Sequence, residues 1–294
     1  MNNIKKPFVL GIDIGGSHIT TALVDLDTRM ILSDSFRRAF VDSQKETEEI
    51  IDKWCQTIND SFNSLDVTTK KIGIAMPGPF DYEKGISLIQ DQPKFRAFYQ
   101  LNIKEALAER LGVPADHIRF INDAAGFLQG EVFSGAARNY NRVLGLTLGT
   151  GLGAAFHEKG LTKDAALWNA PFKDGIAEDY LSTRWFVARY QELTGNSIEG
   201  VKELLQLPGA ERYSGRIFSE FSKNLSDFIT PLIQEHEIEA VVIGGNISNA
   251  AHLFLPEVEQ LLQDKGIQPQ IKITCLKENA SLIGAASCWE NSYL

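Results

Sequence analysis

The chain has 294 residues, which suits two domains of ordinary size, and it carries a formal net charge of -9. That charge would repel a phosphate backbone, and no cluster of Lys and Arg offsets it, so we expect no nucleic-acid partner. The sequence has no run of about 18 apolar residues and no signal-peptide core near its start, so we expect a cytoplasmic protein without a membrane partner. Three cysteines without paired spacing predict neither a disulfide framework nor a cysteine zinc site.

The first half of the sequence predicts an antiparallel meander followed by alternating helices and strands. Two β-rich apolar runs, 8–16 and 18–26, are separated by a glycine turn, and a third run follows at 30–40. Apolar residues then recur at helical spacing within 44–65. The next predicted elements are a strand at 71–78, a helix at 102–112, a strand at 117–123 and a helix at 124–135. Their alternation predicts a parallel α/β layer.

The opening of the chain recurs in its second half. Residues 10–25 and 144–159 align without gaps, both begin Leu-Gly, and Gly15 falls in register with Gly149. The predicted elements that follow are helices at 178–194, 197–206 and 211–236, a strand at 239–247, a helix at 249–265, a strand at 270–276 and a final helix from residue 280. Both halves thus run meander, helix, strand, helix, strand, which favours a duplication over a chance likeness of two glycine hairpins. We expect one domain at 1–121, completed by the C-terminal helix 280–294, and a second at 122–279.

Two tight glycine turns are candidate phosphate-binding loops. They are Gly15-Gly16-Ser17 and Gly149-Thr150-Gly151, each between two predicted strands. Such a turn exposes consecutive backbone N–H groups that can hold an anion without a positive side chain. Either turn alone would be read as an ordinary hairpin. As a matched pair they predict two loops that converge on one phosphate chain.

Two aspartates stand where strands end. Asp13 lies in an apolar run just before the first glycine turn, where a carboxylate must be paired or hold a cation. A hydrated Mg²⁺ on ATP would suit it, and capping of the hairpin amides is the alternative. Asp123 ends a strand and begins a helix with small residues at 124–126. A helix N-cap is one interpretation, but ligands of parallel α/β sheets gather at the carboxyl ends of strands.

A third glycine element lies near the end of the chain. The apolar strand in VVIGGNIS, residues 241–248, ends at Gly244 and Gly245 and leads into a helix. Because these two glycines have no side chains, the backbone there can lie flat against a planar ring or a ribose. A simple strand-to-helix turn remains the alternative.

Taken in order, these segments resemble the ROK family of bacterial sugar kinases and sugar-responsive repressors, within the superfamily of actin, hexokinase and Hsp70. The segments that carry the resemblance are GIDIGGSHI, GIAMPGPFDYEKGI, FINDAAGFLQGE, LGLTLGTGLGAAF and VVIGGNIS, and together they span nearly the whole chain. The resemblance implies an α/β fold with two actin-like domains, a duplicated ribonuclease H-like architecture, and an interdomain cleft.

The resemblance also implies the site residues. ATP and Mg²⁺ would be the cofactors, with Asp13 organising Mg²⁺ through ATP and water. The implied ATP-binding residues are Asp13, Gly15, Gly16, Ser17, His18, Gly149, Thr150, Gly151, Gly244, Gly245 and Asn246. Asp123 would be the catalytic base, and Asn122, Asp123 and Glu178 would contact the sugar.

Two departures from the family pattern lie near Glu178. The family places a cysteine-rich zinc segment just before this glutamate, but residues 169–180 contain no cysteine, so we expect no zinc. Further upstream, the residues 166–169 replace the family's Glu-x-Gly-His element. Asn169 is then the candidate sugar ligand at the position of the histidine, and the identity of the sugar stays open.

The sequence therefore predicts an ATP-dependent kinase that transfers the γ-phosphate of Mg-ATP to a hydroxyl of a hexose or amino sugar. The alternative is an ATP- or sugar-binding pseudokinase or sensor without turnover, because two sugar contacts differ. A repressor would need a DNA-binding segment, and a first strand that begins by Phe8 leaves no room for an N-terminal helix-turn-helix. Because the family commonly forms dimers, we expect a homodimer.

Overall fold

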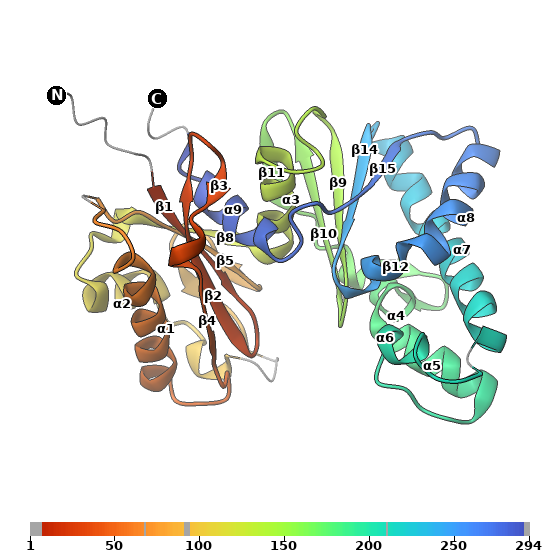
Figure 1. Ribbon diagram of the computed structural model, residues 1–294, viewed down its shortest axis with the longest axis horizontal. Coiled ribbons are helices and arrows are strands. Elements are labelled where there is room, and N and C mark those ends of the chain that lie inside the picture. The colour runs from red at the N-terminus through yellow and green to blue at the C-terminus, as the bar shows by residue number, and fades with distance from the viewer. Residues whose placement is uncertain (1–7, 68, 91–94, 210, 291–294) are drawn as a thin grey trace. The chain divides into compact units, whose positions relative to one another are not determined.

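The chain folds into two compact units (Figure 1). The computed structural model describes residues 8–67, 69–90, 95–209 and 211–290. The first unit contains the chain up to Arg138 together with the residues from Glu278 onward, and the second unit is Asn139–Lys277. None of the helices in the described ranges combines the length and the apolar character that crossing a lipid bilayer requires.

The first unit is built on a mixed sheet with the strand order β3-β2-β1-β5-β8, and β4 also pairs with β2. The strands are β1 (Phe8–Ile14), β2 (His18–Asp25), β3 (Met30–Ile31), β4 (Arg37–Phe40), β5 (Ile72–Met76) and β8 (Ile118–Asn122). β1 pairs antiparallel with β2 and parallel with β5, and β5 pairs parallel with β8. A small hairpin, β6 (Phe80–Asp81) and β7 (Ile86–Ser87), follows β5.

The strand predicted at 30–40 is interrupted. β3 and β4 are separated by a 3₁₀ turn at Ser33–Ser35. The Ser35 hydroxyl accepts a hydrogen bond from the amide of Leu23 at 2.8 Å and donates to the carbonyl of Leu32 at 2.6 Å. In a regular ladder the Leu23 amide would donate to a backbone carbonyl of the neighbouring strand. Here it donates to the Ser35 hydroxyl, and the third strand divides in two.

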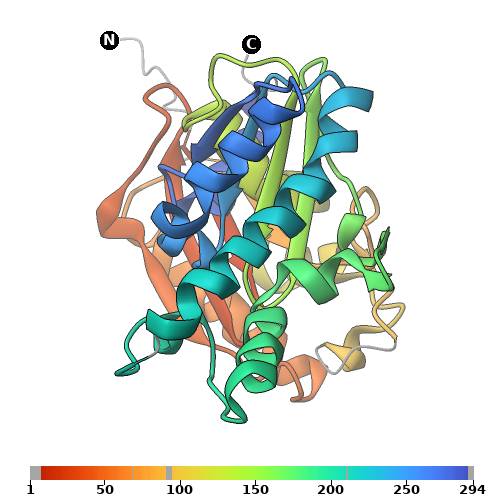
Figure 2. The same cartoon turned by 90° about the vertical axis from the view of Figure 1, so that its right-hand side faces the viewer.

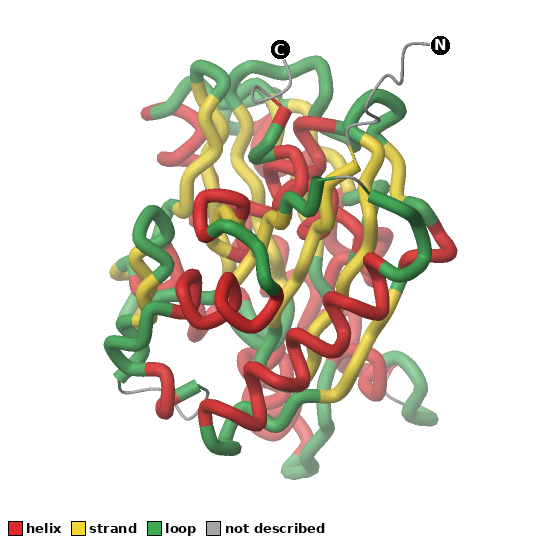
Figure 3. The backbone as a smooth tube through the Cα atoms, turned by 90° about the vertical axis from the view of Figure 1, so that its left-hand side faces the viewer, coloured by secondary structure: helices red, strands yellow, loops and turns green. Residues whose placement is uncertain are grey.

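Helices cover both faces of this sheet. Alternate residues of β1, such as Leu10 and Ile12, enter an apolar core with Trp54 of helix α1 (Thr47–Phe62). Helix α2 (Ile103–Leu111) supplies Leu107 to the same core, and Figure 3 looks onto this face, with helices in front of strands. The opposite face receives helices α3 (Asp123–Phe133) and α9 (Asn279–Ser287). A Cβ on Gly11 would lie 2.0 Å from the carbonyl oxygen of Leu282, so only glycine lets α9 approach β1 this closely.

The first unit extends past the boundary expected at residue 121. Helix α3, which the sequence placed in the second domain, packs against α9 in the first unit. The Gln129 side chain of α3 donates to the Ser287 hydroxyl of α9 at 3.1 Å. The boundary between the units therefore follows Arg138, and α9 ends at Ser287, with 291–294 of the expected helix outside the described residues.

The second unit repeats the topology of the first. Its sheet has the order β11-β10-β9-β14-β15. The strands are β9 (Val143–Leu148), β10 (Leu152–Glu158), β11 (Leu161–Asp164), β14 (Ala240–Gly244) and β15 (Gln270–Ile273). As in the first unit, three antiparallel strands in meander order are followed by two parallel ones. The duplication predicted from the repeated Leu-Gly and glycine-turn pattern is confirmed.

The helices of the second unit bury one face of its sheet. They are α4 (Ala177–Leu181), α5 (Thr183–Thr194), α6 (Val201–Leu204), α7 (Glu211–Glu235) and α8 (Ala251–Asp264). Leu144 and Leu146 of β9 pack in one core with Phe221 of α7 and Phe254 of α8, and Figure 2 shows α7 and α8 lying across the strands. A hairpin of β12 (Pro171–Phe172) and β13 (Gly175–Ile176) precedes α4.

Candidate functional site

The first glycine turn joins β1 to β2. The amide of Gly15 donates to the carbonyl of His18 at 2.9 Å, and the Ser17 carbonyl accepts from the amide of Val41 at 2.9 Å. The Ser17 hydroxyl and the Nδ1 atom of His18 are hydrogen-bonded at 2.8 Å. The Gly15 amide thus closes the turn, and binding of an anion would fall to the amides that follow it.

Asp13 faces a row of polar residues at the end of β1. It pairs across the ladder with Thr20 of β2, which pairs with Arg38 of β4, so the three side chains share one face of the sheet. Arg38 is bonded to Glu278, just before α9, at 2.8 Å. Burial raises the pKa of Asp13 to about 7, the negative charges of Asp123 and Glu278 add to this, and the positive charge of Arg38 opposes it.

This environment favours a cation at Asp13. Close to neutral pH the carboxyl group would be divided between its protonated and ionised forms, so a bound cation would stabilise the ionised form. No hydrogen bond in the described part of the chain joins the Asp13 carboxylate to the hairpin amides. The capping alternative for this residue therefore finds no support.

Asn122, and not Asp123, caps helix α3. The Oδ1 atom of Asn122 accepts from the amide of Ala125 at 3.1 Å, and its Nδ2 donates to the hydroxyl of Tyr82 at 3.2 Å. Asp123 is the first residue of the helix, and its exposed carboxylate accepts from the amide of Ala124 at 2.9 Å. The structural role that competed with catalysis at Asp123 thus belongs largely to its neighbour.

The second glycine loop, Gly149–Gly151, joins β9 to β10 in the second unit. The Gly149 carbonyl accepts hydrogen bonds from the amide and the hydroxyl of Thr183, at 2.8 and 2.9 Å. This contact holds the chain extended at Ser182, which divides the helix predicted at 178–194 into α4 and α5. A Cβ on Gly149 would meet no heavy atom within 4 Å, so the space in front of this loop residue is open.

Glu178 is bonded to this second loop. From α4, its Oε2 accepts from the amide of Leu152 at 2.9 Å, and its Oε1 pairs with Arg184 of α5. A Cβ on Gly151 would lie 2.5 Å from Oε2, so the glycine makes room for the carboxylate. Glu178 therefore does more than begin a helix, because it ties α4 to the end of the loop.

The turn after β14 lies against the same loop. Gly245 has a φ of 82°, and a Cβ there would lie 2.3 Å from the carbonyl oxygen of Leu148, the residue before Gly149. Packing against β9 alone thus explains a glycine at 245. Gly244 is buried, whereas Gly245 and Asn246 are exposed at the start of a 3₁₀ helix. A nucleotide could reach the exposed pair.

Asn169 lies beside the Glu178 segment. It is exposed and ends the 3₁₀ turn Leu167–Asn169. The next residue, Ala170, accepts a hydrogen bond through its carbonyl from the amide of Ala177 at 2.9 Å. One backbone bond thus joins the immediate neighbours of the two predicted sugar ligands.

Each unit thus gathers its own share of the predicted site. Asp13, the residues 15–18, Asn122 and Asp123 belong to the first unit, and all other predicted site residues belong to the second. Arg38 and Arg184 were missed by the sequence analysis. Strand pairing places Arg38 on the same face of the sheet as Asp13, and Arg184 lies past the break at Ser182, so neither shows a local spacing signal.

The metal-binding capacity of the described residues is limited. None of their His, Cys, Asp and Glu side chains form a group of three or more that could hold a metal ion. Mg²⁺ needs no such group, because it usually keeps several waters and binds one or two carboxylates together with substrate phosphates. Asp13 fits that role by its position and its raised pKa.

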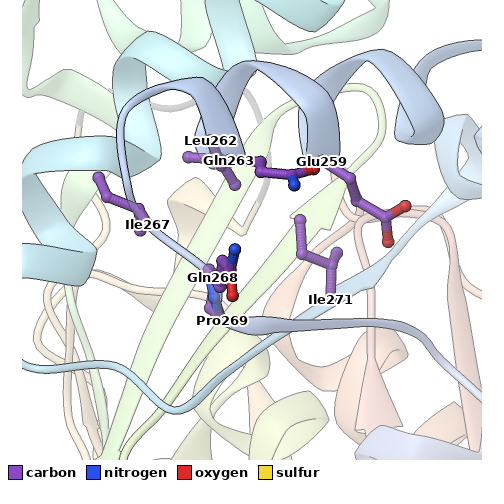
Figure 4. Close-up of a pocket in the computed structure, with 7 residues that line it drawn as sticks. All are labelled: Glu259, Leu262, Gln263, Ile267, Gln268, Pro269 and Ile271. Atoms are coloured by element: carbon purple, nitrogen blue, oxygen red, sulfur yellow. The ribbon is translucent and has the colours of Figure 1, made fainter.

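A separate groove of about 230 Å³ lies between α8 and β15 (Figure 4). Its lining residues are Glu259, Leu262, Gln263, Ile267, Gln268, Pro269 and Ile271. None of them belongs to a glycine loop or to the predicted sugar contacts. The groove therefore has no part in the candidate site.

The model of the ROK family matches residues 9–161 and 173–292. The chain belongs to the ROK family. The unmatched stretch, 162–172, contains the residues 166–169, where the sequence departs from the family's pattern. The membership predicted from the ordered motifs is confirmed.

Two relatives with known activities are similar to this ROK protein. Glucokinase of Thermotoga maritima is 32% identical over 150 residues, which are 51% of this chain and 44% of that protein. N-acetyl-D-glucosamine kinase of Mannheimia succiniciproducens is 24% identical over 315 residues, covering 94% of this chain and 97% of that protein. Both are sugar kinases, in agreement with the predicted enzyme class.

Solved structures show the same fold. Glucokinase from Parabacteroides distasonis superposes with a TM-score of 0.80 at 19% identity, covering 100% of both chains. A ROK family glucokinase from Streptomyces griseus, in complex with glucose and AMPPNP, gives a TM-score of 0.72 at 23% identity over 96% of this chain and 98% of that chain. The predicted two-domain, actin-like α/β class is confirmed.

Proposed function

We propose that this ROK protein is an ATP-dependent kinase that transfers the γ-phosphate of Mg-ATP to a hydroxyl of a hexose or an amino sugar. The named relatives, a glucokinase and an N-acetyl-D-glucosamine kinase, support the reaction class. The observation that carries the proposal is the pair of carboxylates at the end of the first sheet, Asp13 and Asp123, of which Asp123 is exposed while Asn122 caps α3.

Asp123 is the proposed general base. Phosphoryl transfer to a sugar needs a group that accepts the hydroxyl proton while the oxygen attacks the phosphorus. The carboxylate at the first residue of α3 is exposed and lies at the positive end of the helix dipole, which favours negative charge there. The amide of Ala124 holds one carboxylate oxygen and so limits the rotation of the side chain.

Asp13 is the proposed side chain that orients the magnesium of Mg-ATP through water. Mg²⁺ would supply neutralisation of the charge on the phosphate oxygens. Asp13 would accept hydrogen bonds from water, and its face of the sheet would keep it close to the first glycine turn. Arg38 supplies a positive charge on the same face, although Glu278 holds it in this structure.

The proposed ATP contacts follow the three glycine elements. In the first unit the residues 16–18 would offer backbone amides to phosphate, because the Gly15 amide already closes the turn. In the second unit Thr150 and Gly151 would do the same beside the open space at Gly149, whose own amide donates to the Gly151 carbonyl at 3.1 Å. Gly245 and Asn246, exposed beside that loop, would contact the adenosine.

The proposed sugar contacts are Asn122, Asp123, Glu178 and Asn169. Asn122 and Glu178 already make hydrogen bonds within the protein, yet each retains capacity, because a carboxylate offers about four acceptor positions and an amide has two donors. Asn169 is exposed and replaces a family histidine. We propose that the changed residues at 166–169 alter which sugar is preferred.

Release of ADP from ATP, measured in a coupled assay over a panel of hexoses, N-acetylated hexosamines and β-glucosides, tests the proposal. We expect at least one sugar to stimulate ATP consumption well above the rate with water alone, and Asp123→Asn to abolish that stimulation. ATP binding by calorimetry without turnover on any sugar of the panel would instead favour a pseudokinase or sensor. Light scattering would test the homodimer expected from the family.

A further inference from the structure

The hairpin β12–β13 is fastened to two helices by one lysine side chain. Lys173 lies in the turn of the hairpin with a φ of 55°. Its Nζ donates a hydrogen bond to the Oδ1 atom of Asn224 on α7. The same Nζ lies 5.5 Å from the ring centroid of Phe172 and 5.2 Å from that of Tyr180 on α4. One ammonium group therefore joins the hairpin, α4 and α7.

The partner on α7 has few alternatives. Asn224 is only 4% exposed, so its amide oxygen depends on a hydrogen-bond donor from the protein. Removal of the lysine donor would take this bond from an amide oxygen that is little exposed, although Asn224 lines the groove beside Lys173. The contact thus holds the hairpin on α7 together with the ring of Phe172, which meets the ring of Phe228 edge-on at 5.6 Å between centroids.

Further contacts tie α4 to the hairpin on both sides of the lysine. The Tyr180 hydroxyl donates to the carboxylate of Asp174, and the Phe172 ring meets the Tyr180 ring edge-on with centroids 5.4 Å apart. Asp179 accepts a hydrogen bond from the amide of Ile176 at 3.1 Å. The two residues that follow Glu178 are therefore both bonded to the hairpin.

Helix α4 cannot hold its own direction. It has five residues, and helices this short are unstable without tertiary contacts. Its orientation must come from what it touches, which is the core that buries Ala177 and Leu181, the hairpin, and the second glycine loop. Glu178 makes the latter contact through the amide of Leu152.

We propose that Lys173 is a positioning residue that holds α4 so that the Glu178 carboxylate stays against the second glycine loop. The consequence for the sugar rests on the proposed function, in which Glu178 contacts the acceptor. Lys173 itself has no role in the chemistry of transfer. Its loss removes one of the contacts that hold the hairpin and α4 on α7, and the carboxylate is then held less firmly against the loop and the sugar.

Kinetic constants of three variants test this role. Lys173→Met keeps the length of the side chain but removes the charge, and it should raise the KM for the best sugar by about tenfold or more, since small misplacements of a binding group are costly. The KM for ATP should change by much less. Lys173→Arg keeps the cation and should restore the sugar KM. Lys223→Met is the control, since Lys223 lines the same groove of about 600 Å³ beside Lys173.

Hydrogen exchange tests the positioning without any substrate. The Glu178 carboxylate protects the amide of Leu152 from exchange, so in the ligand-free Lys173→Met protein we expect that amide to exchange faster than in wild type. In the Lys223→Met control we expect the wild-type exchange rate. Should Lys173→Met fail to fold, the nearly isosteric Asn224→Leu removes only the hydrogen bond to Lys173 and should show the same change.

The two hypotheses fail in different ways. Wild-type exchange at Leu152 in the lysine or asparagine variant, or equal changes in the sugar and ATP KM values, would overturn the positioning role. Faster exchange at Leu152 supports that role even if no sugar stimulates the wild-type protein. The absence of stimulation by any sugar would overturn only the proposed kinase function.

Discussion

The negative charge of Asp123 raises the pKa of Asp13, and the burial of Asp13 raises that pKa by more. The two carboxylates come from β1 and from the start of α3, and only β5 separates β1 from β8, which leads into that helix. The two carboxylates thus differ in their surroundings, because Asp123 is exposed whereas burial and nearby negative charge raise the pKa of Asp13. The arrangement suits a reaction that uses one carboxylate as a base and the other near magnesium.

Replacement of Asp123 by asparagine should leave the fold intact and reduce turnover strongly. The side chain is exposed and Asn122 provides the cap, so we expect little loss of thermal stability. Loss of a positioned base typically lowers kcat by about 10²- to 10⁴-fold. Steady-state kinetics with the best sugar measure this, and Asp116→Asn, an exposed aspartate of the same unit, is the control. A kcat near the wild-type value would remove Asp123 from the mechanism.

Stability should depend on pH through Asp13. Its folded-state pKa of about 7 lies above the ordinary value of 3.8, so the stabilising contribution of the protonated form is present at low pH and is lost as pH rises from about 4 to about 7. Without Mg-ATP, Asp13→Asn should therefore raise the Tm relative to wild type more at pH 8 than at pH 5. Asp60→Asn, an exposed change on α1, should show no such difference.

Mg-ATP should reduce this dependence on pH, because a cation beside Asp13 favours the ionised carboxylate. Thermal melting with and without Mg-ATP, at both pH values, makes the comparison. Equal pH profiles for wild type and Asp13→Asn in the free protein would show that Asp13 titrates normally.

Two glycine substitutions in the second unit should affect different properties, one the binding of ATP and the other the thermal stability. Gly149→Val places its side chain in open space, so the protein should fold while the KM for ATP rises. Gly245→Val combines a φ of 82° with a contact of 2.3 Å to the Leu148 carbonyl, so it should lower the Tm markedly. Calorimetry of ATP binding and thermal melting separate the two results. Unchanged ATP affinity in Gly149→Val, and likewise in Gly16→Val, would argue against the paired phosphate loops.

Glu178→Gln should raise the KM for the sugar much more than the KM for ATP. The amide oxygen can still accept from Leu152, so the loop stays in place while the charge is lost. If Glu178 served only the dipole of α4, the variant would lose about 0.3 to 1 kcal/mol of stability and keep its sugar kinetics. Arg184→Met, which removes the partner of the carboxylate, separates loss of the ion pair from loss of the sugar contact.

Elemental analysis of purified protein should find no stoichiometric zinc. Cys55 is buried in α1, Cys288 follows α9, and Cys275 is exposed in the second unit. Within the described ranges, none of the His, Cys, Asp and Glu side chains form a group of three or more that could hold a metal ion. One zinc ion per chain would contradict this expectation and would require other ligands.

The architecture was largely predictable because it rests on local patterns that occur twice. Gly15 and Gly149 stand at equivalent turns. The strands on either side contain mainly apolar residues, in agreement with their burial. The exact cap of α3 was not predictable in the same way. Asn122 and Asp123 are both good N-cap residues, and only the extended backbone of Asn122 decides between them.

The remaining differences arise from contacts between residues far apart in sequence. The break at Ser182 depends on Thr183 bonding to Gly149, and the position of Arg38 beside Asp13 depends on strand pairing. The boundary expected after residue 121 moved to Arg138 because α3 packs on a helix near the end of the chain. No window of neighbouring residues contains such information.

That last helix, α9, also sets an order for biosynthesis. The second unit is continuous in sequence, whereas the first needs Glu278 and the residues after it to cover β1 and α3. A ribosome therefore releases every part of the second unit before the first unit can close, although most of the first unit emerges earlier. Until then the glycine-lined surface around Gly11 stays uncovered on the nascent chain, where it is open to chaperones and proteases.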